Sequence, residues 1–368
     1  MANKPNYWDY LRLPELLHLQ DGIESSEADV SVDELHFIVV HQVYELWFKL
    51  IIRSLRLARD HLAEPRVDEE TIPYVVHHLR RVNTTLDLMV RQWRVVETLT
   101  PQDFLAFRDK LVPASGFQSF QMRVVECLMG LDESQRIRYG KVEPLDHIRN
   151  LAEHSPGGAV AWGMLSAARD EQSILGALNQ WLHRTPIQGS QPDDPNDDAV
   201  VTGFLDAYIA RMDENHERQL GDMITRLGED HREHLEARFA DIKQAARTFL
   251  FAEDVIPEEQ ATTRRIRAAV LFIESYRDLP LLSWPRLLLD VIVEMEEQML
   301  LFRNGHARMV ERVIGRRVGT GGSTGVTYLD ETANYRVFRD LWAIRTVLLP
   351  KSRLPPLQQP EFYGFARR

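Results

Sequence analysis

The sequence of 368 residues has a single cysteine, Cys127, so no disulfide can form within the chain. This scarcity suits a reducing compartment. No uninterrupted apolar run reaches the length of about 18 residues that a membrane span requires, and the N-terminal residues lack the apolar core of a signal peptide. From these absences we expect a cytoplasmic protein that does not enter a membrane.

Basic tracts are also missing. Asp and Glu total 55 against 44 Lys and Arg, which gives a net charge of −11. Because nucleic acids and anionic membranes attract basic surfaces, this balance argues against both as partners. There is no dinucleotide-binding fingerprint, no phosphate loop with its lysine and no Gly-x-Ser-x-Gly elbow, so the commonest nucleotide-binding and serine-hydrolase signatures are excluded.

Helical periodicity covers most of the chain, whereas strand-like alternation and hairpin turns do not recur. We therefore predict an all-α fold, a helical bundle forming a single domain over residues 1–368. A charged helical excursion is expected around 200–250, and the composition of 185–198 predicts an exposed loop. The N-terminal segment 1–31 is expected to be mostly irregular, with a short helix at Pro14–Gln20.

Capping residues mark the start of two helices. Ser31 and Glu34 form a capping box ahead of a long helix that ends near Leu62. Thr100 is placed as the N-cap of another helix, with Pro101 in its first turn. Further helices are predicted by the apolar spacing over 73–97, from Trp284 past His306, and over 333–349.

His306 occupies a position that would otherwise be apolar on one long helix. The stripe recurs every three or four residues and comprises Leu288, Ile292, Met295, Met299, Phe302, His306, Met309 and Val313. A glycine-rich segment, 319–325, follows the helix. Such a histidine is a candidate cofactor ligand, although a lone histidine on an apolar stripe is more often a core residue. Gly305 before it lowers helix propensity by about 1 kcal/mol relative to Ala, and no sequence feature accounts for it.

Two other pairs place an aromatic ring one helical turn from a polar group. Phe37 precedes His41, and Phe104 precedes Arg108. A guanidinium group binds a carboxylate with two parallel hydrogen bonds, so Arg108 is a candidate anchor for an acidic substrate group. The structural alternatives are a core histidine bonded to a carbonyl and an arginine that lies on the surface.

Several stretches together resemble the signature motifs of the tryptophan 2,3-dioxygenase family. They are Tyr7–Leu11 (YWDYL), Asp33–Lys49 (DELHFIVVHQVYELWFK), Asp103–Arg108 (DFLAFR), Leu111–Ser119 (LVPASGFQS) and Gly319–Gly325 (GTGGSTG). They lie in family order along most of the chain. The resemblance implies an all-helical enzyme of the tryptophan/indoleamine dioxygenase type that contains haem b. Its reaction would insert both atoms of O2 into the indole C2–C3 bond of L-tryptophan, giving N-formylkynurenine in the kynurenine pathway of tryptophan catabolism.

The resemblance also assigns roles to residues on either side of the haem. By position, His306 would be the axial ligand of the haem iron, and His41 the catalytic distal histidine that meets the indole N–H. Ser115 and Gly116 would lie near the distal side of the haem, where the residues alone equally suit simple helix capping.

For the substrate, the resemblance implies that Phe37 and Phe104 wall the indole and that Arg108 holds the carboxylate. Thr320 would meet the ammonium group. The family assembles as a homotetramer, which implies that segment 1–31 docks on a neighbouring subunit.

Tyr7 and Tyr10 would then contribute to the substrate site of that neighbour.

Two other hypotheses about the function stay open on the sequence. One is a haem mono- or dioxygenase of the same scaffold that acts on a modified tryptophan or another indole in a biosynthetic pathway. The other is a haem-binding protein without catalytic activity.

Overall fold

The computed structural model describes residues 6–23, 26–112, 114, 116–138, 144–319 and 325–364. In this part of the chain every regular element is a helix, and the only β-type contact is an isolated bridge between Ile187 and Ser190. The prediction of an all-α fold is therefore confirmed. The chain divides into two compact units: unit 1 is Met1–Arg56, Arg80–Glu171 and Met295–Arg336, and unit 2 is Leu57–Leu79, Gln172–Glu294 and Val337–Arg368.

Three long helices contribute residues to both units. They are α3 (Val32–Leu62), α4 (Thr71–Val96) and α13 (Ser283–Ile314). Unit 1 also contains α1 (Tyr7–Leu11), α2 (Leu13–Leu16), α5 (Pro101–Phe107), α6 (Phe120–Met129), α7 (Pro144–Ala152), α8 (Pro156–Asp170) and α14 (Val326–Thr332). Unit 2 contains α9 (Ile174–Arg184), α10 (Asp197–Leu227), α11 (Arg232–Leu250), α12 (Pro257–Ser275) and α15 (Arg339–Ala343). The prediction of a single domain stays a prediction.

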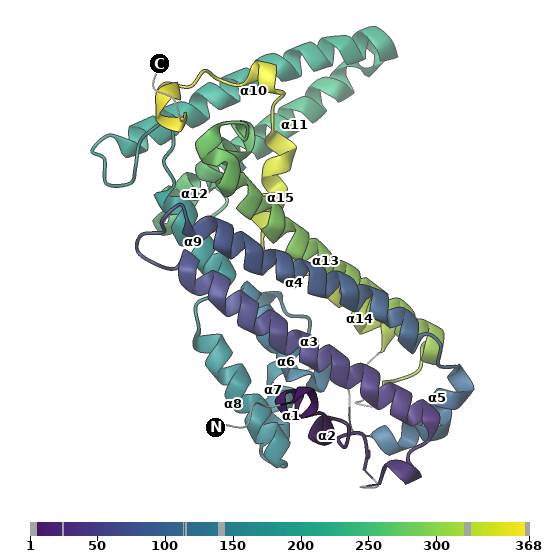
Figure 1. Ribbon diagram of the computed structural model, residues 1–368. Coiled ribbons are helices and arrows are strands. Elements are labelled where there is room, and N and C mark those ends of the chain that lie inside the picture. Colours follow the sequence, from purple (N-terminus) through teal and green to yellow (C-terminus); the bar gives the residue numbers. More distant parts are fainter. Residues whose placement is uncertain are drawn as a thin grey trace, which may run out of the picture. The chain divides into compact units, whose positions relative to one another are not determined.

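In unit 1, the segments of α3, α4 and α13 lie side by side and are joined by aromatic rings (Figure 1). The Trp93 ring lies 4.5 Å from Tyr44 and 5.0 Å from Phe302, measured between ring centroids. Such ring pairs add about 0.5–1.5 kcal/mol to the stabilisation from burial. The apolar members of the predicted α13 stripe are all buried, so the periodicity located the face of this helix that packs.

The predicted helix starts are also confirmed. Ser31 Oγ accepts a hydrogen bond of 3.1 Å from Glu34 N, and Thr100 Oγ1 accepts one of 3.3 Å from Asp103 N. Each side chain satisfies one of the backbone donors that a helix start leaves unpaired.

The α3 helix is long and apolar enough, by length and composition alone, to cross a membrane, with a mean hydropathy of 1.3 in its most apolar window. The sequence prediction considered only uninterrupted apolar runs, and polar residues interrupt this helix. One of those polar residues is engaged with protein, since Glu45 accepts hydrogen bonds from the side chains of Ser119 and Gln121. A core helix of a globular protein passes the same test of composition.

The bounds predicted for two helices near the chain ends were wrong. Near the N-terminus, α1 and α2 replace the helix expected at Pro14–Gln20. Near the C-terminus, a continuous helix was expected over 333–349. In the structure α14 ends at Thr332 and α15 begins only at Arg339, so 333–338 is not helical. Phe338 has non-helical dihedral angles and is 1% exposed, so burial of its ring takes precedence over local helix propensity.

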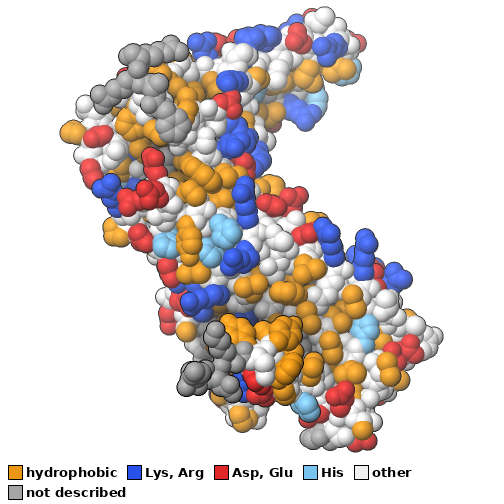
Figure 2. Space-filling view, viewed as in Figure 1, with side chains coloured by type: hydrophobic (Ala, Val, Ile, Leu, Met, Phe, Trp, Pro, Cys, Tyr) orange, Lys and Arg blue, Asp and Glu red, His pale blue; other side chains and the backbone are white. Residues whose placement is uncertain are grey.

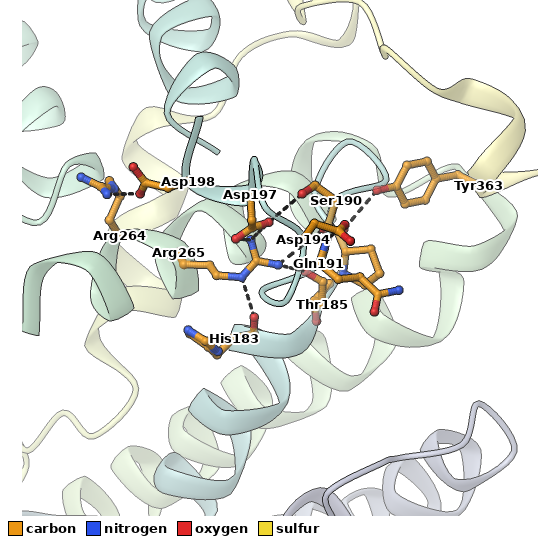
Figure 3. Close-up of polar contacts among 11 residues, drawn as sticks. His183, Thr185, Ser190, Gln191, Asp194, Asp197, Asp198, Arg264, Arg265 and Tyr363 are labelled. Atoms are coloured by element: carbon orange, nitrogen blue, oxygen red, sulfur yellow. Dashed lines mark hydrogen bonds and ion pairs between the residues drawn. The ribbon is translucent and has the colours of Figure 1, made fainter. Parts of the chain in front are cut away.

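The exposed loop predicted for 185–198 is confirmed over most of its second half, but the prediction is wrong for 185–190, which is largely buried in unit 2 (Figure 3). The Arg265 guanidinium donates to the carbonyl oxygens of His183 and Thr185, at 2.7 and 3.2 Å, and to the Asp197 carboxylate at 2.8 Å. Gly189 N donates to the Tyr363 hydroxyl at 2.8 Å. Arg265 of α12 and Tyr363 thus satisfy several polar groups of a loop whose composition alone is typical of the surface.

Candidate active site

His306 is presented by α13 inside unit 1. Its imidazole is stacked on the Trp93 indole of α4, with the ring centroids 4.8 Å apart and the planes inclined by 5°. Burial, together with the nearby charges of His41 and Arg123, lowers the pKa of His306 to about 4. Neither ring nitrogen has a hydrogen-bond partner among the described residues. At neutral pH His306 is therefore an uncharged imidazole whose lone pair is available to a metal.

His41 has a different hydrogen-bonding pattern, which fixes its tautomer. Its Nδ1 lies 2.7 Å from the carbonyl oxygen of Phe37, one turn earlier on α3. Since a carbonyl can only accept, Nδ1 carries the proton and Nε2 keeps a lone pair. Burial lowers the pKa of His41, although its hydrogen bond to Phe37 opposes this effect. His41 is thus a neutral ring that can accept a hydrogen bond at Nε2.

Three phenylalanine rings form a cluster that contacts His41 through Phe37. The Phe37 ring is 4.0 Å from the imidazole, and it lies 5.9 Å from Phe104 and 5.7 Å from Phe107. Phe104 and Phe107 are themselves 5.3 Å apart on α5. Sequence reasoning identified Phe37 and Phe104 but missed Phe107, whose three-residue spacing from Phe104 places it on the same helix face. The cluster forms an apolar wall suited to a flat ring.

The two histidines belong to one site. Ring contacts connect them through Tyr44, which is 6.5 Å from His41 and 4.5 Å from Trp93, and Trp93 is in turn stacked on His306. A positive charge on His41 lowers the pKa of His306, as expected for groups close enough to repel.

Arg108 follows α5 and lies beside the segment that precedes the glycine-rich stretch. Its Nη2 donates to the carbonyl oxygen of Val318 at 2.5 Å, while its Nε is buried and has no hydrogen-bond partner in the described part of the chain. A buried guanidinium nitrogen without a partner is costly, and an acidic ligand group would satisfy it. Thr320, two residues beyond Val318, lies outside the described residues.

The other predicted site residues are less tightly placed. Ser115 lies outside the described residues. Gly116 begins a short 3-10 helix, Gly116–Gln118, and its carbonyl accepts a hydrogen bond of 3.2 Å from Ser119 N. Tyr7 and Tyr10, on α1, are 71% and 77% exposed, and Figure 2 shows hydrophobic side chains gathered on this face near the N-terminal helices. The structure of one chain does not bring the two tyrosines into the site around His41.

A buried ionic cluster next to the site was missed by sequence reasoning. The Glu126 carboxylate of α6 lies 3.1 Å from Arg123, 2.5 Å from Arg136 and 2.7 Å from Arg303. Burial alone would raise the pKa of Glu126, but the three guanidinium groups hold it below its usual value. Three positive charges against one negative charge leave an excess of two. Arg123 Nε is buried without a hydrogen-bond partner in the described part of the chain. Only the i, i+3 spacing of Arg123 and Glu126 on a largely apolar helix could have signalled the cluster.

The fold and this site define a class: an all-helical protein with one neutral imidazole that has no hydrogen-bond partner among the described residues and a second neutral imidazole beside an aromatic wall. Residues 2–348 match the model of the family described as "Tryptophan 2,3-dioxygenase". The chain belongs to the tryptophan 2,3-dioxygenase family.

Individual relatives agree with that assignment. The chain is 46% identical over 365 residues to "Tryptophan 2,3-dioxygenase" of Sorangium cellulosum, covering 98% of this chain and 87% of the relative. It is 47% identical over 370 residues to "Tryptophan 2,3-dioxygenase 2" of Ralstonia nicotianae, covering 98% of both. It is 32% identical over 357 residues to "Tryptophan 2,3-dioxygenase" of Dictyostelium discoideum, covering 95% of this chain and 85% of the relative. These names favour neither a biosynthetic oxygenase nor a non-catalytic haem protein.

Proposed function

We propose that this protein is a haem-dependent tryptophan 2,3-dioxygenase, which inserts both atoms of O2 into the C2–C3 bond of L-tryptophan to give N-formylkynurenine. One observation carries the proposal most directly. His306 and His41 are two neutral imidazoles in one aromatic site, and only His41 has a ring nitrogen bonded to protein in the described part of the chain. His306 is therefore suited to bind iron, and His41 to bind substrate.

The residues present fit haem b. His306 offers a neutral imidazole inside an apolar environment, which suits an axial ligand of haem iron. Arg123 supplies a buried guanidinium Nε without a partner in the described chain, and its charge is felt at His306. The excess of two positive charges around Glu126 matches the two propionates of a haem. When bound, haem supplies the activation of O2.

The chain's own residues bind and orient the substrate. His41 Nε2 would accept a hydrogen bond from the indole N–H, while Phe37 and Phe104 hold the ring by apolar contact. The unpaired Nε of Arg108 would donate to the substrate carboxylate. Thr320 is proposed to bind the ammonium group from the adjoining glycine-rich segment.

Ser115 and Gly116 are proposed to lie near the distal side of the haem. Glu45 supports this placement, since it accepts a hydrogen bond of 2.6 Å from Ser119 Oγ and so fixes the end of their turn to the helix that carries His41.

We also propose that the enzyme is a cytoplasmic homotetramer without nucleic-acid or membrane partners. The exposed rings of Tyr7 and Tyr10 support docking of segment 1–31 on a neighbouring subunit, because large aromatic side chains rarely remain fully exposed. The net charge of −11 and the single cysteine support the remaining parts of this proposal.

The function is tested with haem-loaded protein, ascorbate, O2 and L-tryptophan, with the product followed by mass spectrometry. We expect a mass gain of both oxygen atoms from isotopically labelled O2. A product that carries one labelled atom, or no product, would contradict the proposal. His306→Ala should lose the Soret band of bound haem, whereas His154→Ala, a change at an exposed histidine that lies outside the site, should keep it.

A further inference from the structure

Gly305 lies where another side chain approaches the backbone of α13 closely. A Cβ atom built at this position would be 2.7 Å from Cδ1 of Trp93 and 3.3 Å from its Nε1. Real Cβ atoms do not approach ring atoms so closely, and the Trp93 ring is buried and packed on other sides by Tyr44 and Phe302. The absence of a side chain at Gly305 is therefore what admits the indole, and this accounts for a glycine in the middle of a helix.

The indole is held in this position by a hydrogen bond to α13. Trp93 Nε1 donates to the carbonyl oxygen of Phe302 at 3.1 Å. This carbonyl lies four residues before His306, one helical turn away. Trp93 is therefore attached to the same turn of helix that carries the candidate iron ligand, and its plane is fixed relative to that turn.

The same ring is stacked flat on the imidazole of His306, with the centroids 4.8 Å apart and the planes 5° from parallel. Metal-binding histidines are usually oriented by a hydrogen bond from the second ring nitrogen to a carboxylate or carbonyl group. His306 has no such protein partner among the described residues. Among the described residues, the stacked indole face therefore restricts rotation of the imidazole about its side-chain bonds.

We propose that Trp93 and Gly305 act together as a positioning pair that sets the ring orientation of His306 by stacking. The inference rests on the proposed function, because it takes His306 as the axial ligand of haem. Trp93 is a positioning residue that acts through His306, and Gly305 is required because any side chain there would displace the indole.

The test uses haem-loaded protein and two readouts besides turnover. The first is the iron–histidine stretching band of the ferrous protein in resonance Raman spectra. The second is the rate at which haem is lost to an excess of apomyoglobin. In Trp93→Leu we expect a shifted or split band and a rate of haem loss raised roughly 10- to 100-fold, the range typical when the group that orients a metal ligand is removed. Trp93→Phe keeps a stacking ring and should lie between Trp93→Leu and the original protein in both readouts.

A double-mutant comparison tests the role of Gly305. Gly305→Ala should accelerate haem loss as Trp93→Leu does, because the added methyl group moves the indole. In the Trp93→Leu background the same Gly305→Ala change should have almost no further effect, since the ring that it displaces is absent. This combined variant also keeps the test decisive if Gly305→Ala alone does not fold. Two controls in unit 1 should leave both readouts unchanged: Gly163→Ala, where an added Cβ meets nothing within 4 Å, and Trp162→Leu, on the same helix.

Two outcomes would overturn the proposal. One is an unchanged band and haem-loss rate in Trp93→Leu. The other is an equal effect of Gly305→Ala with and without Trp93. His306→Gly, with and without added imidazole, separates these outcomes from failure of the ligand assignment. If that variant loses the band and imidazole restores it, His306 is the ligand, and a silent Trp93→Leu then refutes the positioning pair alone.

Discussion

Replacing Arg108 with alanine should weaken the binding of L-tryptophan by a factor that the structure allows us to bound. One guanidinium nitrogen of Arg108, Nη2, already donates to the Val318 carbonyl, while Nε is buried without a partner in the described chain. At least one charge-assisted hydrogen bond to the substrate carboxylate is therefore available, and such a bond contributes about 1.5–3 kcal/mol. The dissociation constant should rise about 10- to 150-fold.

The assay is titration of the haem Soret band with L-tryptophan and with tryptamine, which has the same indole and ammonium groups but no carboxylate. The original protein should prefer L-tryptophan by about the same 10- to 150-fold factor, and Arg108→Ala should lose that preference while binding tryptamine unchanged. Arg91→Ala is a matched control, because Arg91 has a side chain that is 72% exposed on α4. If Arg108→Ala weakened both ligands by the same factor, the residue would be stabilising the site rather than binding a carboxylate.

The remaining predictions concern the uncharged form of buried His41 and the ionised form of buried Glu126. Because burial lowers the pKa of His41, its neutral form should persist below the ordinary imidazole value of about 6.5. In a pH profile of kcat/KM, protonation of His41 should then cause no loss of activity until the pH falls below that value. The prediction would be contradicted by a loss of activity on the acid side with a midpoint at or above about 6.5 that is absent in His41→Phe. Glu126→Gln should destabilise the protein by about 3–5 kcal/mol in denaturant unfolding, because three buried arginines lose their common carboxylate. Glu133→Gln, at an ion pair whose glutamate is 60% exposed, should change stability by about 1 kcal/mol or less.

Features that depend on neighbouring residues along the chain were predictable. The caps at Ser31 and Thr100 and the buried stripe of α13 follow from local hydrogen bonding and helical spacing, and the structure confirms them. The pairing of Phe37 with His41 could also be expected, because the two residues are one turn apart on a helix.

Features that depend on contacts between distant segments were not predictable. The burial of 185–190 requires Arg265 of α12, and the break before Arg339 follows from the burial of Phe338. Composition assigns 185–190 to the surface, and propensity assigns the stretch before Arg339 to a helix. Both assignments fail because neither measure includes the distant residue that decides the outcome. The charge cluster around Glu126 was missed for the same reason, because two of its three arginines lie on other segments.

The roles proposed for the two site histidines, metal ligand and substrate-binding residue, could not be separated by residue type and periodicity. Both stand on an apolar stripe of a long helix, and burial lowers the pKa of both. What differs is the group that restrains each ring. A carbonyl on its own helix holds His41 Nδ1 and leaves Nε2 as an acceptor, whereas His306 is restrained by an indole from α4 and has both nitrogens free of described protein partners. A ring held by stacking keeps its lone pair for a metal, and a ring held by donation at Nδ1 can accept a proton donor at Nε2. The proposed division of roles therefore rests on the position of Trp93, which the indole can take because residue 305 has no side chain.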